Sequence, residues 1–193
     1  MRTVILGANS QIAQEFNKLL SKETVRGHLD YVNSEEDSFL ICTGYLKGWD
    51  LRDHIEHSLN SSFMVNYVKI ATYCDKVFEI NPRARICIIG SESGFKGSYD
   101  MAYAGAKAAM HLYIETKKLG PLQQLVGISP TIIGDARMTT VRKDIENLER
   151  RKQEHPKRRF LKSIEVARLA KFLLYDDEGY TTNTVIRMHG GAV

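Results

Sequence analysis

Short apolar runs alternate along this chain with longer stretches in which apolar residues recur at helical spacing. A short apolar run bounded by polar or turn-forming residues is typical of a buried strand, and the longer periodic stretches are typical of helices. Their alternation predicts a mostly parallel sheet covered by helices. The predicted strands are 3–6, 39–42, 86–89, 125–129 and 184–188, and the predicted helices are 11–20, one or two within 51–80, about 100–118, and 164–174.

Length and composition predict one domain. With 193 residues, 43% of them hydrophobic, the chain can bury one sizeable core. No apolar run approaches the roughly 20 residues of a membrane span, and the apolar start is too short for a signal peptide. We therefore expect a single cytoplasmic domain, 1–193. Cys42, Cys74 and Cys87 lie in apolar surroundings without a Cys-x-x-Cys spacing, which predicts free thiols and no metal site.

The sequence Tyr103-Ala-Gly-Ala-Lys107 carries the clearest chemical signal. Two residues four apart on a helix lie on the same face, one turn from each other. The charge of Lys107 would favour the phenolate and lower the pKa of Tyr103 from about 10. Such a tyrosine is a general acid for a carbonyl oxygen or a general base for an alcohol. The pattern predicts a carbonyl/alcohol redox site, although an amphipathic helix can also present this spacing by chance.

Further segments surround this pair in a fixed order. The sequence Ile-Gly-Ser-Glu-Ser-Gly carries Ser91 at the end of strand 86–89, twelve residues before Tyr103, and Asn60 stands on the preceding helical stretch. The other matching segments are 126–133, with Thr131 in the place of a glycine, 164–167, 172–174 and 185–191. Together they resemble the short-chain dehydrogenase/reductase family over nearly the whole chain. The resemblance implies a Rossmann-like, doubly wound, mostly parallel sheet that binds NAD(P).

The resemblance also implies a catalytic role for each of four residues. Tyr103 would donate a proton to the substrate carbonyl, and Lys107 would lower the pKa of Tyr103 and bind the nicotinamide ribose. Ser91 would orient and polarise the carbonyl. Asn60 would hold a water that links Lys107 to solvent. The structural alternatives are a turn serine that caps local backbone and a helix amide without a role.

The turn from Gly7 to Ala13 stands where Rossmann-type sheets bind the dinucleotide pyrophosphate. The resemblance places Gly7, Gln11 and Ala13 at the family's three glycines, and Gln11 is the main departure. Asn9 and Ser10 still offer donors to a phosphate, while the alternative is a plain turn capped by Ser10. The residues expected at the cofactor are Gly7, Asn9, Ser10, Gln11, Ile12, Thr43, Gly44, Tyr103, Lys107, Pro130, Ile132 and Ile133.

The adenosine-binding half is unusually short. Only 36 residues separate Gly7 from Gly44, whereas the family has two further strands and a helix there. The stretch 24–33 must cover both, so we expect a strand and a helix to be missing. In the family, an acidic or basic residue in this region selects NAD or NADP. Asp30 or Arg26 could take that place, and the general basicity of the chain gives NADP a slight preference.

A basic segment at about 135–162 corresponds to the family's lid over the substrate. Between 137 and 162 there are ten basic residues against four acidic ones, an excess of +6 against +4 for the whole chain. The basic residues are Arg137, Arg142, Lys143, Arg150, Arg151, Lys152, Lys157, Arg158, Arg159 and Lys162. This lid would suit a phosphorylated, carboxylated or nucleotide-linked substrate. The alternative is a solvated helix kept soluble by its charges. The absence of interleaved aromatic residues argues against nucleic acid.

Two functions remain open. The first is an NAD(P)-dependent oxidoreductase for a small polar or sugar-like carbonyl compound, which the complete Tyr103, Lys107, Ser91 and Asn60 set favours. The second is a redox-inactive protein of the same fold, acting as a dinucleotide sensor or subunit partner, which the shortened half favours. Small residues on the helix at about 100–118 permit close helix packing, and family members associate through that helix. We therefore expect a homodimer or homotetramer.

Overall fold

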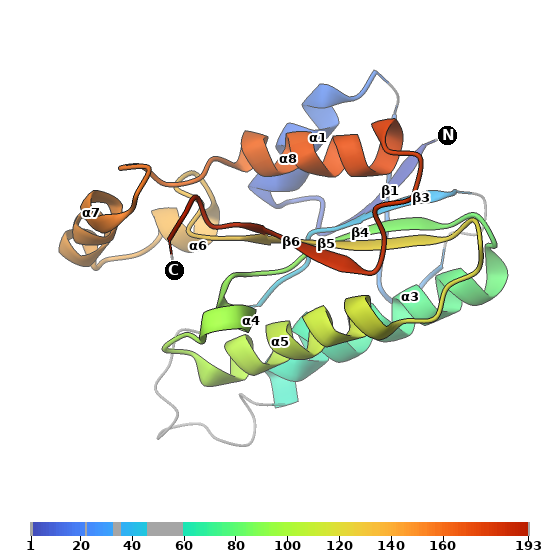
Figure 1. Ribbon diagram of the computed structural model, residues 1–193, viewed down its shortest axis with the longest axis horizontal. Coiled ribbons are helices and arrows are strands. Elements are labelled where there is room, and N and C mark those ends of the chain that lie inside the picture. The colour runs from blue at the N-terminus through green and yellow to red at the C-terminus, as the bar shows by residue number, and fades with distance from the viewer. Residues whose placement is uncertain (1, 22, 33–35, 46–59, 193) are drawn as a thin grey trace.

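The computed structural model describes residues 2–21, 23–32, 36–45 and 60–192. Among them, six strands form one parallel sheet in the order β2-β1-β3-β4-β5-β6 (Figure 1). The strands are β1 (Thr3–Leu6), β2 (Thr24–Arg26), β3 (Ser38–Ile41), β4 (Arg85–Ile89), β5 (Gln124–Pro130) and β6 (Thr184–Met188). The mostly parallel sheet predicted from the apolar runs is confirmed.

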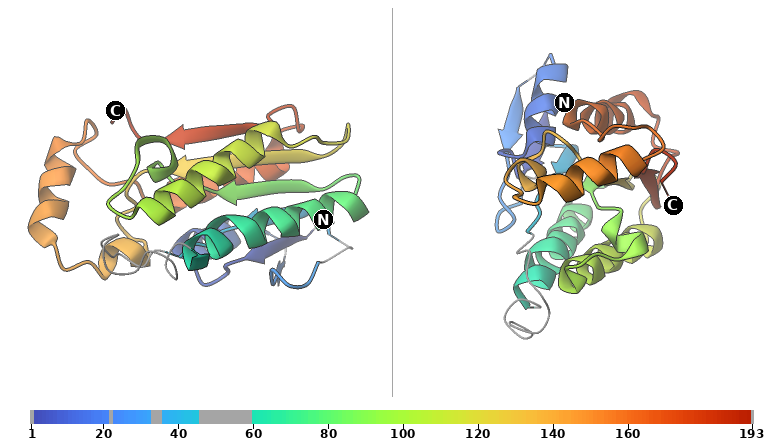
Figure 2. Two further views of the ribbon diagram at one scale, coloured as in Figure 1. Left: turned by 90° about the horizontal axis from the view of Figure 1, so that it is seen from below. Right: turned by 90° about the vertical axis from the view of Figure 1, so that its left-hand side faces the viewer.

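Helices cover both faces of the sheet (Figure 1). One face carries α1 (Gln11–Leu19) and α8 (Ser163–Lys171), and the other carries α3 (Lys69–Ile80) and α5 (Met101–Thr116). A π-helical turn, η1 (Met64–Val68), precedes α3, and another, η2 (Phe172–Asp176), follows α8. The short helices α4 (Ser93–Lys96) and α6 (Arg137–Thr140), together with α7 (Ile145–Glu154), lie toward the carboxyl ends of the strands (Figure 2). No helix of the described residues is long and apolar enough to span a membrane.

Apolar side chains on the two faces of the sheet form two core clusters. In β1, Val4 and Leu6 belong to the cluster beneath α3 and α5, whereas Ile5 belongs to the cluster beneath α1 and α8. A strand that is buried on both faces needs apolar residues at every position, which is why these strands read as continuous apolar runs. Each fully buried Val, Leu or Ile side chain contributes roughly 1.5–3 kcal/mol.

The structure confirms the shortened half. β2 has three residues and is the edge strand beside β1. Between β2 and β3, the described residues hold an isolated bridge between His28 and Tyr31 and no helix. A strand and a helix are therefore missing on this side. The helical stretch predicted within 51–80 begins outside the described residues and is helical from Asn60 onward.

Phe16 tests the packing of α1. Its fully buried ring lies in the cluster beneath α1 and α8. We expect Phe16→Ala to lower the free energy of unfolding by roughly 3–5 kcal/mol, because the lost burial leaves a cavity. The exposed Gln14 of the same helix is the control, and Gln14→Ala should stay within about 0.5 kcal/mol of wild type. Urea unfolding followed by circular dichroism measures both, and equal effects would contradict this packing.

Candidate active site

The predicted catalytic residues Ser91, Tyr103 and Lys107 meet beyond the carboxyl end of β4. Parallel α/β sheets bind ligands outside the carboxyl ends of their strands. Ser91 follows β4 by two residues, and Tyr103 and Lys107 lie on α5, which packs across that end of the sheet (Figure 1). The carboxylate of Asp100 accepts a hydrogen bond from the backbone N–H of Tyr103 at 2.9 Å. This N-cap fixes the start of α5, and so it places Tyr103 in the first turn.

Tyr103 and Lys107 are both buried, with exposed fractions of 8% and 2%. The ammonium of Lys107 lies 5.7 Å from the centroid of the Tyr103 ring and donates a hydrogen bond to the carbonyl of Ile89, at 3.2 Å. The side chain of Ser91 lies close enough to the Tyr103 phenol to lower its pKa. The structure therefore brings together three of the four predicted catalytic residues.

Burial dominates the electrostatics of this group. It raises the pKa of Tyr103, the Ser91 side chain lowers it, and the nearby Asp100 and Tyr99 raise it. Burial also lowers the pKa of Lys107 to about 8. The expectation that Lys107 would bring the pKa of Tyr103 below its ordinary value is therefore wrong for the chain by itself. The physical reason is that loss of solvent disfavours both charged forms.

The structure buries Asn66 rather than Asn60, the asparagine that the sequence analysis selected. Asn60 is exposed, whereas Asn66 in η1 is fully buried. The Asn66 side-chain oxygen accepts from the N–H of Tyr45 at 2.9 Å, and its nitrogen donates to the carbonyls of Tyr45 and Ser62 at 2.8 and 3.0 Å. Asn66 thus fastens the segment after β3 to the helix, within a π-helical turn of the kind that is frequent at functional sites.

The helical periodicity of the sequence indicates that Asn66 is buried. Asn66 shares one helical stripe with Ile70, Cys74 and Val77, all of which are buried. A polar residue on an apolar stripe must be buried and must find hydrogen-bond partners. Asn60 lies off that stripe, and only the family resemblance favoured it. Helical periodicity would have distinguished the two asparagines.

The turn after β1 fits a dinucleotide phosphate. Gly7 has φ +80°, and a Cβ at this position would lie 2.8 Å from the backbone of Cys42. Only glycine permits this approach of β1 to the segment after β3. The Ser10 hydroxyl accepts from the N–H of Ala13 at 3.2 Å and caps α1. The side chain of Gln11 runs along α1 and donates to Glu15 at 3.3 Å, so its amide is held toward the helix.

The remaining cofactor candidates divide by burial. The Thr43 hydroxyl is buried without a hydrogen-bond partner in the described part of the chain, and Gly44 beside it is exposed. Such an orphaned group beside the Gly7 turn suits a polar ligand. By contrast, the side chains of Ile12 and Ile133 are buried in the core, and Pro130 ends the fully buried strand β5. Any contact from Ile12 or Ile133 to a cofactor must come from backbone atoms.

Arg26, rather than Asp30, reaches this turn. Arg26 ends β2, and its exposed guanidinium donates to the side-chain oxygen of Asn9 at 3.0 Å. Asp30 is exposed and lies against His28 instead, at 3.3 Å. The structure thus places a cation beside the cofactor turn and gives the carboxylate a different neighbour.

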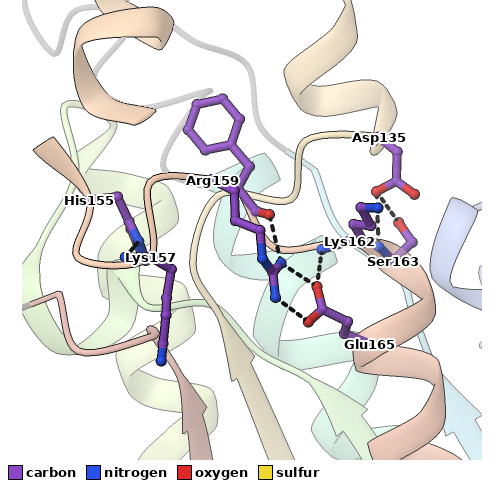
Figure 3. A network of polar contacts seen from close by, with 8 residues as sticks. Asp135, His155, Lys157, Arg159, Lys162, Ser163 and Glu165 are labelled. Atoms are coloured by element: carbon purple, nitrogen blue, oxygen red, sulfur yellow. Dashed lines mark hydrogen bonds and ion pairs between the residues drawn. The ribbon is translucent and has the colours of Figure 1, made fainter. Parts of the chain in front are cut away.

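Polar contacts attach the two ends of the basic segment 135–162, the expected lid, to the start of α8. One carboxylate oxygen of Asp135 accepts from both the backbone N–H and the hydroxyl of Ser163, at 2.9 and 3.0 Å (Figure 3). Arg159 forms a two-point ion pair with Glu165, with both contacts at 2.7 Å (Figure 3). Glu165 also accepts from the N–H of Lys162 at 2.9 Å. These bonds join the first and last residues of the basic segment to the start of α8.

No residue of α7 is buried, and its charges are largely paired within the helix. Lys152 pairs with Glu149 and Arg150 with Glu154, each at 3.1 Å. This pairing favours the solvated-helix interpretation for α7. Beyond α7, a cavity of about 190 Å³ opens between the lid and the ends of β5 and β6. It is lined by Thr131, His155, Lys157, Arg159, Leu161, Glu165, Met188 and Gly190.

No protein-family model and no curated protein matches the sequence. Solved structures match it closely in fold. The short-chain dehydrogenase/reductase described as a glucose/ribitol dehydrogenase from Brucella melitensis has a TM-score of 0.83 at 17% identity, covering 98% of this chain and 96% of that one. The 3-oxoacyl (acyl-carrier-protein) reductase from Agrobacterium tumefaciens with NADP bound has a TM-score of 0.83 at 17% identity, covering 99% and 94%.

A third match has the same character. The actinorhodin polyketide ketoreductase with NADPH has a TM-score of 0.82 at 17% identity, covering 98% of this chain and 96% of that one. The matches span nearly the full length of each protein. The chain therefore has the fold of the short-chain dehydrogenases/reductases.

Proposed function

We propose that this protein is an NAD(P)-dependent oxidoreductase that interconverts a carbonyl and an alcohol on a small polar substrate. The observation that carries the proposal is the buried group of Tyr103, Lys107 and Ser91, which lies at the same edge of the sheet as the glycine turn after β1. The fold shared with solved reductases supports it. The orphaned hydroxyl of Thr43 supports a polar ligand there.

The mechanism follows from the hydrogen bonds. The nicotinamide, when bound, supplies or accepts the hydride. Tyr103 donates its phenolic proton to the carbonyl oxygen of the substrate, and Ser91 donates a hydrogen bond to the same oxygen. Both groups can share that oxygen because their side chains lie next to one another at the end of β4. Lys107 carries a charge below about pH 8, and that charge opposes the cost of forming the Tyr103 phenolate in a buried site.

Asn66 takes the part first assigned to Asn60. Within the described residues its side-chain hydrogen bonds go to Tyr45 and Ser62, so Asn66 positions the segment after β3 rather than touching the substrate. A π-helical turn departs from the regular helical pattern of backbone bonds and can thereby hold a water. We place the proton path from Lys107 to solvent at this turn.

The cofactor we favour is NADP. The exposed guanidinium of Arg26 at the end of β2 would pair with a 2′-phosphate, because arginine binds phosphate through two parallel N–H bonds. Two of the compared reductases contain NADP or NADPH. Asp30 does not approach the turn, so the structure offers no acidic residue there in the described part of the chain.

The basic residues of the lid bear on whether the substrate is anionic. Four of the basic lid residues have carboxylate partners: Arg142, Lys152, Arg150 and Arg159. Lys157 lines the cavity and has no ion pair among the described residues, so it is the position that supports an anionic group on the substrate. We also propose a cytoplasmic homo-oligomer that associates through α5, where the side chains of Met101 and Leu112 are exposed.

A redox-inactive dinucleotide sensor is the second candidate, and the raised pKa of Tyr103 and the shortened adenosine half favour it. A fluorescence titration with NADPH and NADH, followed by a screen of small ketones and aldehydes, separates the two. Binding with turnover supports the oxidoreductase, and binding without turnover supports the sensor.

Tyr103→Phe should lower turnover by roughly 10²–10⁴-fold, the usual contribution of a general acid. The affinity for NADPH should change less than about threefold, since only a hydroxyl is lost. Tyr180 is exposed and distant in sequence from this group, which makes Tyr180→Phe the matched control, with wild-type rates. Steady-state rates and NADPH fluorescence measure the two quantities. Full activity in Tyr103→Phe would remove the acid/base assignment.

Arg26→Ala should weaken NADPH binding by roughly 10–100-fold and leave NADH binding unchanged, because one charge-assisted contact to the phosphate is lost. Arg83 is an exposed arginine at the amino ends of the strands, and Arg83→Ala should bind both cofactors as wild type does. Calorimetric titration gives the four dissociation constants. An equal loss for NADH and NADPH would argue against 2′-phosphate recognition.

Asn66→Ala should lower the free energy of unfolding by about 1–3 kcal/mol and reduce turnover, because it leaves buried backbone groups of Tyr45 and Ser62 unpaired. Asn60→Ala should stay within about 0.5 kcal/mol of wild type and keep its activity. Urea unfolding and initial rates compare the variants. A larger loss of activity in Asn60→Ala would restore the original assignment.

A further inference from the structure

The turn that carries Ser91 is bonded to the neighbouring strand on both sides of the serine. The N–H of Gly90 donates to the carbonyl of Ile128 at 2.7 Å, and the N–H of Glu92 donates to the carbonyl of Pro130 at 3.0 Å. The Ser91 hydroxyl accepts from the N–H of Ser93 at 3.2 Å. Its own proton therefore stays available for a second hydrogen bond. These bonds fix the turn against β5 but not against α5, the helix that carries Tyr103.

An ion pair between the buried carboxylate of Glu92 and the exposed guanidinium of Arg187 extends this attachment to β6. Glu92, 2% exposed, accepts two hydrogen bonds from the guanidinium of Arg187, at 3.0 and 2.7 Å. Arg187 lies on β6, two strands away from β4 in the sheet. A two-point bond between planar groups restricts both distance and direction. The side chain of Glu92, the residue after Ser91, is thus bound to β6.

His111 supplies the attachment to α5. Its ring lies against the two glycines that flank Ser91: a Cβ on Gly90 would lie 2.7 Å from it, and one on Gly94 would lie 2.5 Å from it. Phe95 stacks on the His111 ring, with centroids 4.5 Å apart, and the guanidinium of Arg187 lies 4.5 Å from the centroid of Phe95. His111 is 4% exposed.

Glu92, Phe95, His111 and Arg187 thus form a closed ring of contacts around Ser91, which we call the serine collar. Burial and the charge of Lys107 lower the pKa of His111 to about 4, so its ring is neutral at physiological pH and packs against the glycines without a charge. Because His111 follows Lys107 by one helical turn, the collar joins the serine turn to the same helix that carries Tyr103 and Lys107.

We propose that the serine collar positions the Ser91 hydroxyl against Tyr103, with Glu92 and Arg187 as positioning residues for the carbonyl chemistry. The importance of the Ser91–Tyr103 contact for catalysis rests on the proposed function. The collar sets the separation between a loop that follows β4 and a helix, two elements that no covalent constraint holds together at this point. A purely structural pair would stabilise the fold without changing how Tyr103 responds to Ser91.

Tyrosine labelled with ¹³C at Cζ reports this contact directly. The Tyr103 resonance is assigned with Tyr103→Phe, and Ser91→Ala should shift it in the wild-type background. The collar is opened with Glu92→Met combined with Arg187→Met, which replaces the ion pair by apolar groups and leaves the buried Glu92 position without an unpaired charge. Arg168→Met, at an exposed position on α8, is the control.

In the opened collar, we expect Ser91→Ala to move the Tyr103 resonance by less than a third of its wild-type shift, because the contact is already lost. In the Arg168→Met background the full shift should persist. Equal shifts in all three backgrounds would overturn the proposal. If circular dichroism shows that the double variant does not fold, Phe95→Leu is used instead. Phe95 is half-exposed, and its replacement removes the stack on His111 while Glu92 and Arg187 stay in place.

Turnover provides the second readout. Removing one donor to a developing oxyanion costs roughly 10²–10³-fold in kcat. Ser91→Ala should show that loss in wild type and less than about threefold in the opened collar, with KM changing little. The resonance needs neither cofactor nor turnover. If the Ser91→Ala shift of the Tyr103 resonance depends on the collar but the protein shows no turnover, the collar proposal is retained and the oxidoreductase is rejected. If the protein turns over substrate but the shift does not depend on the collar, the oxidoreductase is retained and the collar proposal is rejected.

Discussion

The buried contact between the Lys107 ammonium and the Ile89 carbonyl is the constraint on which the site depends. An ammonium removed from water is strongly unfavourable unless it finds a hydrogen-bond acceptor, and here the partner is the last carbonyl of β4. Its position fixes α5 along the strand direction. Tyr103 then lies one turn away, beside the serine that follows the same strand. Burial lowers the pKa of Lys107 to about 8, so its charge is maintained at neutral pH but only narrowly.

The shortened half does not disturb this arrangement, for a geometric reason. The missing strand and helix belong to the side of β1 that faces away from β3, so β3, β4, β5 and β6 keep their order and register. Gly7 still lets the turn after β1 approach the segment after β3. The loss falls on the region around β2, where Arg26 stands alone beside Asn9. The region around β2 can thus be shortened without changing the order of β3 to β6.

Much of the site was predictable because its signals are local. The spacing of Tyr103 and Lys107 fixes their shared helix face, and Ser91 stands at the end of an apolar run. The family resemblance pointed to Asn60, whereas the structure buries Asn66, which lies on the apolar stripe of its helix. Glu92 and Arg187 lie 95 residues apart in two separate segments, so no local pattern could pair them. The sign of the Tyr103 pKa change was also missed, since it depends on burial.

The amino-acid sequence by itself determined the class of fold, the order of strands and helices, the shortened half and the identity of the tyrosine, lysine and serine. Period and spacing decide these, and both are written along the chain. The tertiary structure alone decided which asparagine is buried, which residue reaches the cofactor turn, which lid charges are paired and how the serine is held against the tyrosine. Each depends on distances between segments far apart in sequence, which form only when the sheet and its helices pack.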